Sequence, residues 1–217
     1  MEFSKTRSGI VLAMLLTSVC YYFGNGLNGN FWFLVWIAPI PVLCLAFANP
    51  GRLTFFAAFI AYLIGRMSLL SYLVTVATIP PAVIYTIAPA LIFGSIVLVT
   101  RAAAQRRNAR VAVFAFPVLF TAFEYLLFRF SPDGTALSIA YSQMNFLPLI
   151  QIASVTGILG ICFIITLIPS SIAFCFRKYS AGFSFLIIPG LLIGAVFLLG
   201  GFRLGHAIRI TSRGWAG

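Results

Sequence analysis

Three long stretches of this chain carry no charged side chain: residues 8–51, 67–100 and 134–176. A helix in the core of a small soluble domain needs a polar outer face, so uninterrupted apolar stretches of this length do not fit a soluble core. A hydrocarbon layer of about 30 Å requires roughly 20 apolar residues for each helical span. The pattern therefore predicts an all-α integral membrane protein that crosses the bilayer several times.

Helix breakers divide the apolar stretches into separate expected spans. These breakers are the Gly/Asn-rich residues 24–30, Asn49-Pro50-Gly51, Pro80-Pro81 and the arginine-rich loop 101–110. The resulting seven spans, placed to within a few residues, are 9–23, 31–48, 53–76, 81–100, 111–128, 147–176 and 183–202. We expect a polytopic seven-helix transmembrane domain at residues 1–204 and a short tail at residues 205–217.

Basic residues are distributed unequally between the two ends of these spans, and cytoplasmic loops carry the excess of Lys and Arg. On the side of the N-terminus stand nine: Lys5, Arg7, Arg52, Arg101, Arg106, Arg107, Arg110, Arg177 and Lys178. The opposite side has four: Arg129, Arg203, Arg209 and Arg213. We therefore expect a cytoplasmic N-terminus and a periplasmic C-terminus, with the first span retained as a signal anchor because no small-x-small cleavage site follows it.

Composition adds little about chemistry. The chain is 62 % hydrophobic and 8 % charged, its net charge is +11, and its mean hydropathy is +1.09. Because the basic residues cluster at the ends of apolar stretches, the positive charge is explained by topology and predicts no nucleic-acid partner. The four cysteines all fall in apolar stretches without a C-x-x-C motif, and there is one histidine, His206. We expect no metal site, no cofactor and no disulfide framework.

Arg66 and Glu124 are the charged residues that fall inside expected spans. A charge at this depth costs several kcal/mol, so such residues usually face the interior of the bundle and pair with one another. Each lies about 13 residues from the cytoplasmic start of its helix, which places both roughly 20 Å deep. The sequence favours a buried Arg66–Glu124 ion pair that fixes helix packing, with a substrate or headgroup site as the alternative. No second carboxylate, histidine or lysine lies in a span, so we assign no catalytic residue.

Small residues mark expected close contacts between helices. Gly190 and Gly194 form a G-x-x-x-G motif in the last span, which allows close approach of a neighbouring helix. We expect ordinary packing there in preference to a dedicated dimer face, because the motif is common in apolar helices.

A more specific pattern lies between residues 115 and 165. Phe123-Glu124-Tyr125-Leu126 precedes a loop that ends in Tyr141-Ser142-Gln143, and a span follows with Gln151-x-Ala-Ser-x-Thr-Gly157-x-x-Gly160. This pattern resembles the membrane domain of the apolipoprotein N-acyltransferases, which complete bacterial lipoprotein maturation. Gly200-Gly201-Phe202-Arg203-Leu204 is similar to the family's exit from its seventh helix. Over the first four spans mainly the hydropathy pattern agrees.

The resemblance implies a location in the bacterial inner membrane and acyl transfer from phospholipid to the amino group of a lipidated cysteine. In the family a nitrilase-like domain with a catalytic Glu, Lys and Cys follows the seventh helix. These 217 residues carry no cysteine outside the expected spans and no lysine after Lys178. A thioester mechanism requires an accessible thiolate beside a base, so we expect no acyltransferase activity from this chain alone. Ala136 and Leu159 also stand where the family often has tryptophan.

Three function classes remain open. The chain is an acyltransferase component that works with a separate nitrilase-like chain, a scaffold or accessory subunit of a larger membrane complex, or a small lipid-handling or transport protein. Membrane lipids are expected partners in all three. The candidate polar residues within the membrane or facing lipid are Arg66, Glu124, Tyr141, Ser142, Gln143 and Gln151. The candidate helix-packing glycines are Gly157, Gly160, Gly190 and Gly194.

Overall fold

The computed structural model describes residues 6–25, 29–106, 109–131, 134–177 and 186–214, and within these ranges it contains helices and no strand. Five stretches of helix are long and apolar enough to cross a membrane: Arg7–Gly24, Gly51–Val76, Ile79–Arg106, Arg110–Phe130 and Ala153–Phe176. Two shorter apolar helices are Leu34–Ala48 and Ile187–Arg203. The prediction of an all-α, polytopic membrane bundle is confirmed, with five long apolar helices and two shorter ones in the described residues.

Several spans are built from more than one helical piece. The elements in chain order are α1 (Arg7–Gly24), α2 (Leu34–Ile37), α3 (Pro39–Ala48), α4 (Gly51–Arg66), η2 (Met67–Leu69), α5 (Leu70–Ala77), α6 (Ile79–Arg106), α7 (Ala109–Ala112), α8 (Ala115–Phe130), η3 (Ile139–Gln143), α9 (Leu147–Ile150), α10 (Ala153–Phe176) and α11 (Ile187–Gly214). Helix α11 continues to Gly214, past the expected end of the membrane domain at residue 204. The last three residues of the expected tail lie outside the described residues.

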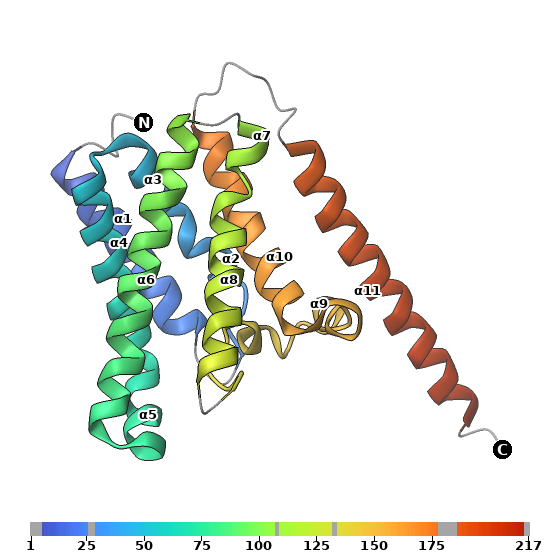
Figure 1. The fold of residues 1–217 in the computed structure, drawn as a ribbon. Helices are drawn as coiled ribbons and strands as arrows, with labels where there is room; N and C mark the ends of the chain where they lie inside the picture. The colour runs from blue at the N-terminus through green and yellow to red at the C-terminus, as the bar shows by residue number, and fades with distance from the viewer. Residues whose placement is uncertain (1–5, 26–28, 107–108, 132–133, 178–185, 215–217) are drawn as a thin grey trace.

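The start of α1 and α7 lie at one end of the bundle, and α5 and the end of α11 lie towards the other (Figure 1). At the first end, Arg101 donates from Nε to the carbonyl of Asn49 at 2.8 Å, just after α3 ends. Arg177 donates from Nη1 to the carbonyl of Ala104 in the last turn of α6, at 2.7 Å. Cations in these positions satisfy helix C-terminal carbonyls and complement the helix dipole. Of the basic residues counted for this end, Lys5, Arg107 and Lys178 lie outside the described residues.

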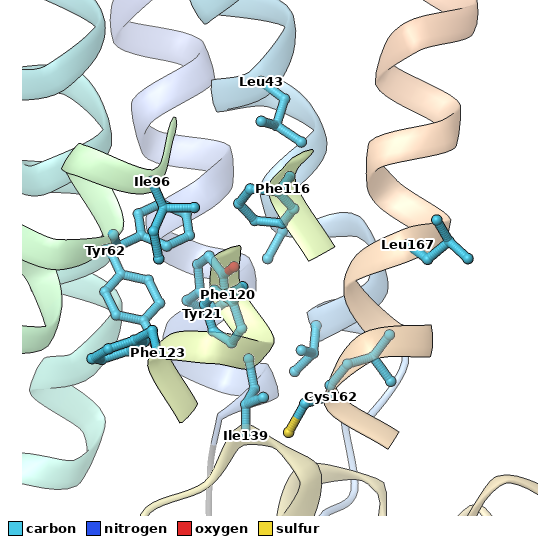
Figure 2. Close-up of a cluster of buried hydrophobic side chains, with 14 of the residues drawn as sticks. Tyr21, Leu43, Tyr62, Ile96, Phe116, Phe120, Phe123, Ile139, Cys162 and Leu167 are labelled. Atoms are coloured by element: carbon cyan, nitrogen blue, oxygen red, sulfur yellow. The ribbon is translucent and has the colours of Figure 1, made fainter. Parts of the chain in front are cut away.

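Aromatic rings fill the centre of the bundle. Tyr62 of α4 stacks on Phe93 of α6 with ring centroids 4.3 Å apart, and Tyr21 of α1 meets Tyr62 edge-on at 4.8 Å. Phe93 continues edge-on to Phe116 and Phe120 of α8, at 6.0 and 6.3 Å. Figure 2 shows this cluster, with Ile139 and Cys162 at its lower edge. Offset and edge-to-face ring pairs of this kind contribute beyond their buried area, so the cluster ties α1, α4, α6 and α8 together.

Two prolines, one at the start of α8 and one inside α6, leave a backbone carbonyl four residues earlier without its usual N–H donor, and a side chain from another helix donates to each carbonyl. Pro117 has no N–H to donate to Val113, and the hydroxyl of Ser170 in α10 donates to the Val113 carbonyl at 2.7 Å. Pro89 in α6 likewise cannot donate to Tyr85, and Arg66 donates from Nη2 to the Tyr85 carbonyl at 2.9 Å. In a membrane helix such a freed carbonyl must find a partner within the protein. The two prolines therefore create specific contacts between helices.

Helix α11 stands apart from the bundle along much of its length (Figure 1). It approaches the chain closely at Gly200, where an added Cβ would overlap the carbonyl of Pro148 in α9. Nothing lies within 4 Å of a Cβ built at Gly190 or Gly194, so the predicted packing there is not found among the described residues and stays a prediction. The physical reason is that α11 diverges from α10, so no described helix lies opposite its G-x-x-x-G face.

Candidate functional site

A cavity of about 340 Å³ opens between α4, α6, α8 and α10, on the side of the bundle away from the N-terminus. Its lining residues are Arg66, Tyr85, Pro89, Glu124, Leu127, Phe128, Ser131, Gly134, Thr135, Leu137, Ser138, Thr156, Gly157, Ile158 and Leu159. Most of the surface that these residues present to the cavity is apolar. A mainly apolar cavity with a few convergent polar groups is the usual form of a ligand site.

The cavity lies one helical turn beyond the aromatic core. Arg66 follows Tyr62 by four residues in α4, and Glu124 follows Phe120 by four residues in α8. Residues four apart lie on the same face of a helix. Each helix therefore directs a ring into the core and, one turn further on, a charge into the cavity.

Arg66 is 4 % exposed, although it carries a full charge. Its Nη2 binds the Tyr85 carbonyl, and its guanidinium carbon lies 5.9 Å from the centre of the Tyr62 ring. Its Nε is buried and has no hydrogen-bond partner among the described residues. A buried donor without a partner costs free energy. This N–H at the cavity wall is therefore an unsatisfied hydrogen-bond donor among the described residues.

Glu124 is 5 % exposed and lines the same cavity. Its carboxylate interacts with the hydroxyl of Ser138 and the backbone N–H of Ile139, at the start of η3. The predicted direct ion pair with Arg66 is wrong, since no such contact exists between these two described residues. The reason is local: Pro89 supplies a carbonyl for Arg66, η3 supplies donors for Glu124, and the cavity lies where the predicted contact would be. The two charges attract each other only over a longer distance.

Gly157 interrupts α10 at the cavity. It has φ 69° and ψ −172°, a conformation that side chains with a Cβ rarely adopt. Nothing lies within 4 Å of a Cβ built there, so Gly157 is needed for its backbone shape, and the predicted helix packing at this glycine is not found. A Cβ at Gly160 would overlap the Thr156 side chain, so this close contact lies within α10 itself. The break turns residues 156–159 toward the cavity.

The other predicted polar residues do not line the main cavity. Gln143 is fully buried, and its Oε1 accepts from Trp36 Nε1 at 2.8 Å. Its Nε2 donates to the Trp32 carbonyl and to Ser142 Oγ, at 3.1 and 2.8 Å. Gln143 therefore fastens η3 to the residues before and within α2, and Ser142 supports the Gln143 amide from within η3. Tyr141 is 41 % exposed, and its hydroxyl lies 2.9 Å from Thr135 Oγ1. Gln151 is half-buried, and its carbonyl accepts from Ser154 Oγ at 2.6 Å.

Among the cavity residues that sequence reasoning missed, Tyr85, Pro89 and Ser138 matter most, because they position the two charges. Pro89 was a usable signal, because a proline within a span frees the carbonyl four residues earlier and a buried cation is a natural partner. Ser138 begins η3 and accepts from the backbone N–H of Ala140 at 3.3 Å. No spacing in the sequence marks Ser138 as a neighbour of Glu124, because the loop between them sets that contact.

One of the comparisons with known proteins gives a match. The comparison with curated proteins gives no match. The family model for the apolipoprotein N-acyltransferase N-terminal domain matches residues 8–171, a range that includes α1 to α9 and most of α10 with every cavity residue. The resemblance seen in residues 115–165 therefore extends over the bundle, and this multi-pass membrane chain belongs to the apolipoprotein N-acyltransferase N-terminal domain family.

Proposed function

We propose that this chain is the membrane component of an apolipoprotein N-acylation system in the bacterial inner membrane. The observation that carries the proposal is the family match over residues 8–171, which covers the whole cavity with its two buried charges. In this role the membrane domain receives lipid at its outer end. Transfer of the acyl chain is performed by a nitrilase-like catalytic part, as the family resemblance implies.

The chemistry of the described residues supports a receiving role and not a transferring one. Cys20, Cys44, Cys162 and Cys175 lie in membrane helices, with Cys162 fully buried. Thioester formation needs a thiolate that substrate can reach, next to a base. We expect the purified chain to show no turnover with phospholipid and a diacylated lipopeptide. Turnover lost with a single cysteine substitution would instead identify a nucleophile within the bundle.

Reconstitution in cells tests the proposal directly. Cells depleted of their own N-acyltransferase receive this chain, a separately encoded nitrilase-like domain, or both, and the N-terminal peptide of a lipoprotein is weighed by mass spectrometry. We expect the mass of one added acyl chain only when both parts are present. Equal acylation by the catalytic domain alone would remove the chain from the reaction and favour a scaffold role.

The proposal also requires the cavity end of the bundle to face the periplasm. The nine-to-four asymmetry of basic residues predicts this orientation. A periplasm-active reporter fused after Gly217 is expected to be active, and one fused in the loop at residues 107–108 is expected to be silent. The reverse pattern would place the cavity on the cytoplasmic side, away from lipoprotein maturation.

A further inference from the structure

Three contacts of α11 fall on one short segment of the chain, residues 146–154, which we call the α9 seat. Figure 1 shows α9 between the lower end of α10 and α11. The contacting pairs are Phe197 with Phe146, Gly200 with Pro148, and Arg203 with Ser154. The approach at Gly200 is the tightest, because a Cβ added there would overlap the Pro148 carbonyl. Two turns of α11 therefore hold the α9 seat by a ring contact, a backbone contact and a hydrogen bond.

The α9 seat leads directly into the backbone break of α10. Gly157 has φ 69° and ψ −172°, and the helix resumes at Ile158. The first N–H groups of a helix have no partner within it. In an unbroken α10 the same N–H groups would donate to carbonyls one turn earlier. Glycine can adopt helical as well as left-handed angles, so α10 has a second arrangement available in which it runs straight through Gly157.

Both sides of the break border the cavity. Thr156 lines it before the break, and Ile158 and Leu159 line it after the break. A change of Gly157 to helical angles redirects the chain that precedes it, because these two torsions set the angle between the two parts of α10. Straightening α10 would therefore move the cavity wall and carry the α9 seat away from α11. The contacts at Gly200 and Arg203 oppose this movement.

We propose that α11 is a lever that controls the cavity through the α9 seat. While α11 holds the seat, α10 stays broken at Gly157 and the cavity is open. When the seat is released, α10 becomes one continuous helix and the wall formed by residues 156–159 moves. By linkage, any occupant that requires the open cavity strengthens the hold of α11 on the seat, whatever the chemistry of that occupant. The inference goes beyond the proposed function, because the lever can be measured in this chain alone, without acyl transfer.

Amide hydrogen exchange of the purified full chain in detergent, read by mass spectrometry, tests the lever. Gly200→Ala adds a Cβ against the Pro148 carbonyl and releases the α9 seat. The amides of residues 158–160 are then expected to exchange about tenfold more slowly, a change within the range of coupling found between linked sites. The reason is that a continuous α10 supplies these amides with acceptors. Gly190→Ala is the matched control, because it makes the same substitution in the same helix with nothing within 4 Å, and it is expected to leave this exchange unchanged.

A contact that serves only structure gives the opposite result. Its loss in Gly200→Ala would speed exchange in residues 146–154 and leave residues 158–160 unchanged or faster, and either outcome at residues 158–160 would overturn the proposal.

Two further variants keep the test decisive if Gly200→Ala does not fold, and unchanged protection of α6 shows that each variant is folded. Arg203→Ala removes the donor to Ser154 from an exposed position and is expected to slow the same amides by a smaller factor. Gly157→Ala disfavours the left-handed angles of the break itself and is expected to slow them without any change in α11. Faster exchange at residues 158–160 in Gly157→Ala would mean that α10 has no continuous arrangement, and the lever would be rejected.

Discussion

The aromatic core and the cavity are adjacent turns of the same helices, yet they are built in opposite ways. In the core, Tyr62 and Phe93 stack at 4.3 Å and are almost completely buried. One turn later in α4 and one turn earlier in α6, Arg66 and Pro89 border a cavity of about 340 Å³. In the aromatic core, the stacked rings fill the space between the helices. At the level of the cavity, Pro89 frees the Tyr85 carbonyl and Arg66 binds it, and the space beside them stays open.

The comparison indicates where the stability and the specificity of this domain reside. Membrane helices gain little from the hydrophobic effect between themselves, so close packing is what holds them together. The core supplies that packing, and the cavity can then retain a buried donor without a partner. A rigid layer beneath a site holds charged side chains in place better than a loop would.

The largest expected effect comes from removing a ring of the core. Phe93→Ala deletes a fully buried side chain that contacts Tyr21, Tyr62, Phe116 and Phe120. It should destabilise the chain by about 3 kcal/mol or more, because the rigid surroundings cannot fill the space. Leu127→Ala at the cavity wall should cost only about 1 kcal/mol. Thermal unfolding in detergent measures both, and equal losses would mean that the cavity wall is packed as tightly as the core.

The backbone break in α10 gives the next largest effect. Gly157→Ala places a Cβ at φ 69°, ψ −172°, which should cost about 1–3 kcal/mol through backbone strain alone, since no neighbour is within 4 Å. Gly190→Ala in α11 meets the same open space in a helical conformation. It should stabilise the chain by about 0.5–1 kcal/mol, because alanine is the better helix former. Thermal unfolding measures both variants. A change of Tm in the same direction for Gly157→Ala and Gly190→Ala would contradict the expected difference between a strained and a helical backbone.

A smaller effect is expected where η3 joins the core. Gln143→Leu removes the acceptor of Trp36 Nε1 and should cost about 1–2 kcal/mol, because the indole N–H loses its partner. Tryptophan fluorescence should change, since Trp36 is one of three tryptophans in the chain. Gln105→Leu is the control, because Gln105 is exposed and its side chain accepts a hydrogen bond from the Arg101 guanidinium of the neighbouring turn. An unchanged emission spectrum for Gln143→Leu would mean that η3 is held mainly by other contacts.

The smallest expected quantity is the coupling between the two cavity charges. In a double-mutant cycle of Arg66→Leu and Glu124→Leu, the stability losses should add to within about 1 kcal/mol, because the residues bind different neighbours. Thermal unfolding of the two single variants and the double variant provides the cycle. If the double variant recovered most of the stability lost in the single variants, the result would support the direct ion pair that the sequence alone favoured.

Much of the fold could be read from the sequence, because a bilayer imposes simple constraints. Uncharged stretches located the spans, and equal distances from the helix starts placed Arg66 and Glu124 at one level, where the structure brings them to one cavity. The gap between them was not predictable from spacing. It depends on Tyr85 and Ser138 as tertiary partners and on Gly157, whose backbone conformation no pattern of polarity encodes. The divergence of α11 was missed for the same reason. A G-x-x-x-G motif permits close packing of a neighbouring helix, but it does not show that a neighbouring helix is present.

Arg101 and Arg177 have one further consequence for how such a chain is assembled. During insertion their positive charge is available to determine which loops stay in the cytoplasm. In the folded bundle the same guanidinium groups bind the carbonyls of Asn49 and Ala104, so they also join the ends of different helices. Replacement by lysine would preserve the charge and lose the planar arrangement of donors. The insertion of the chain and the closure of the bundle at the end that carries α7 would then separate, giving a correctly inserted protein with loosened helix ends.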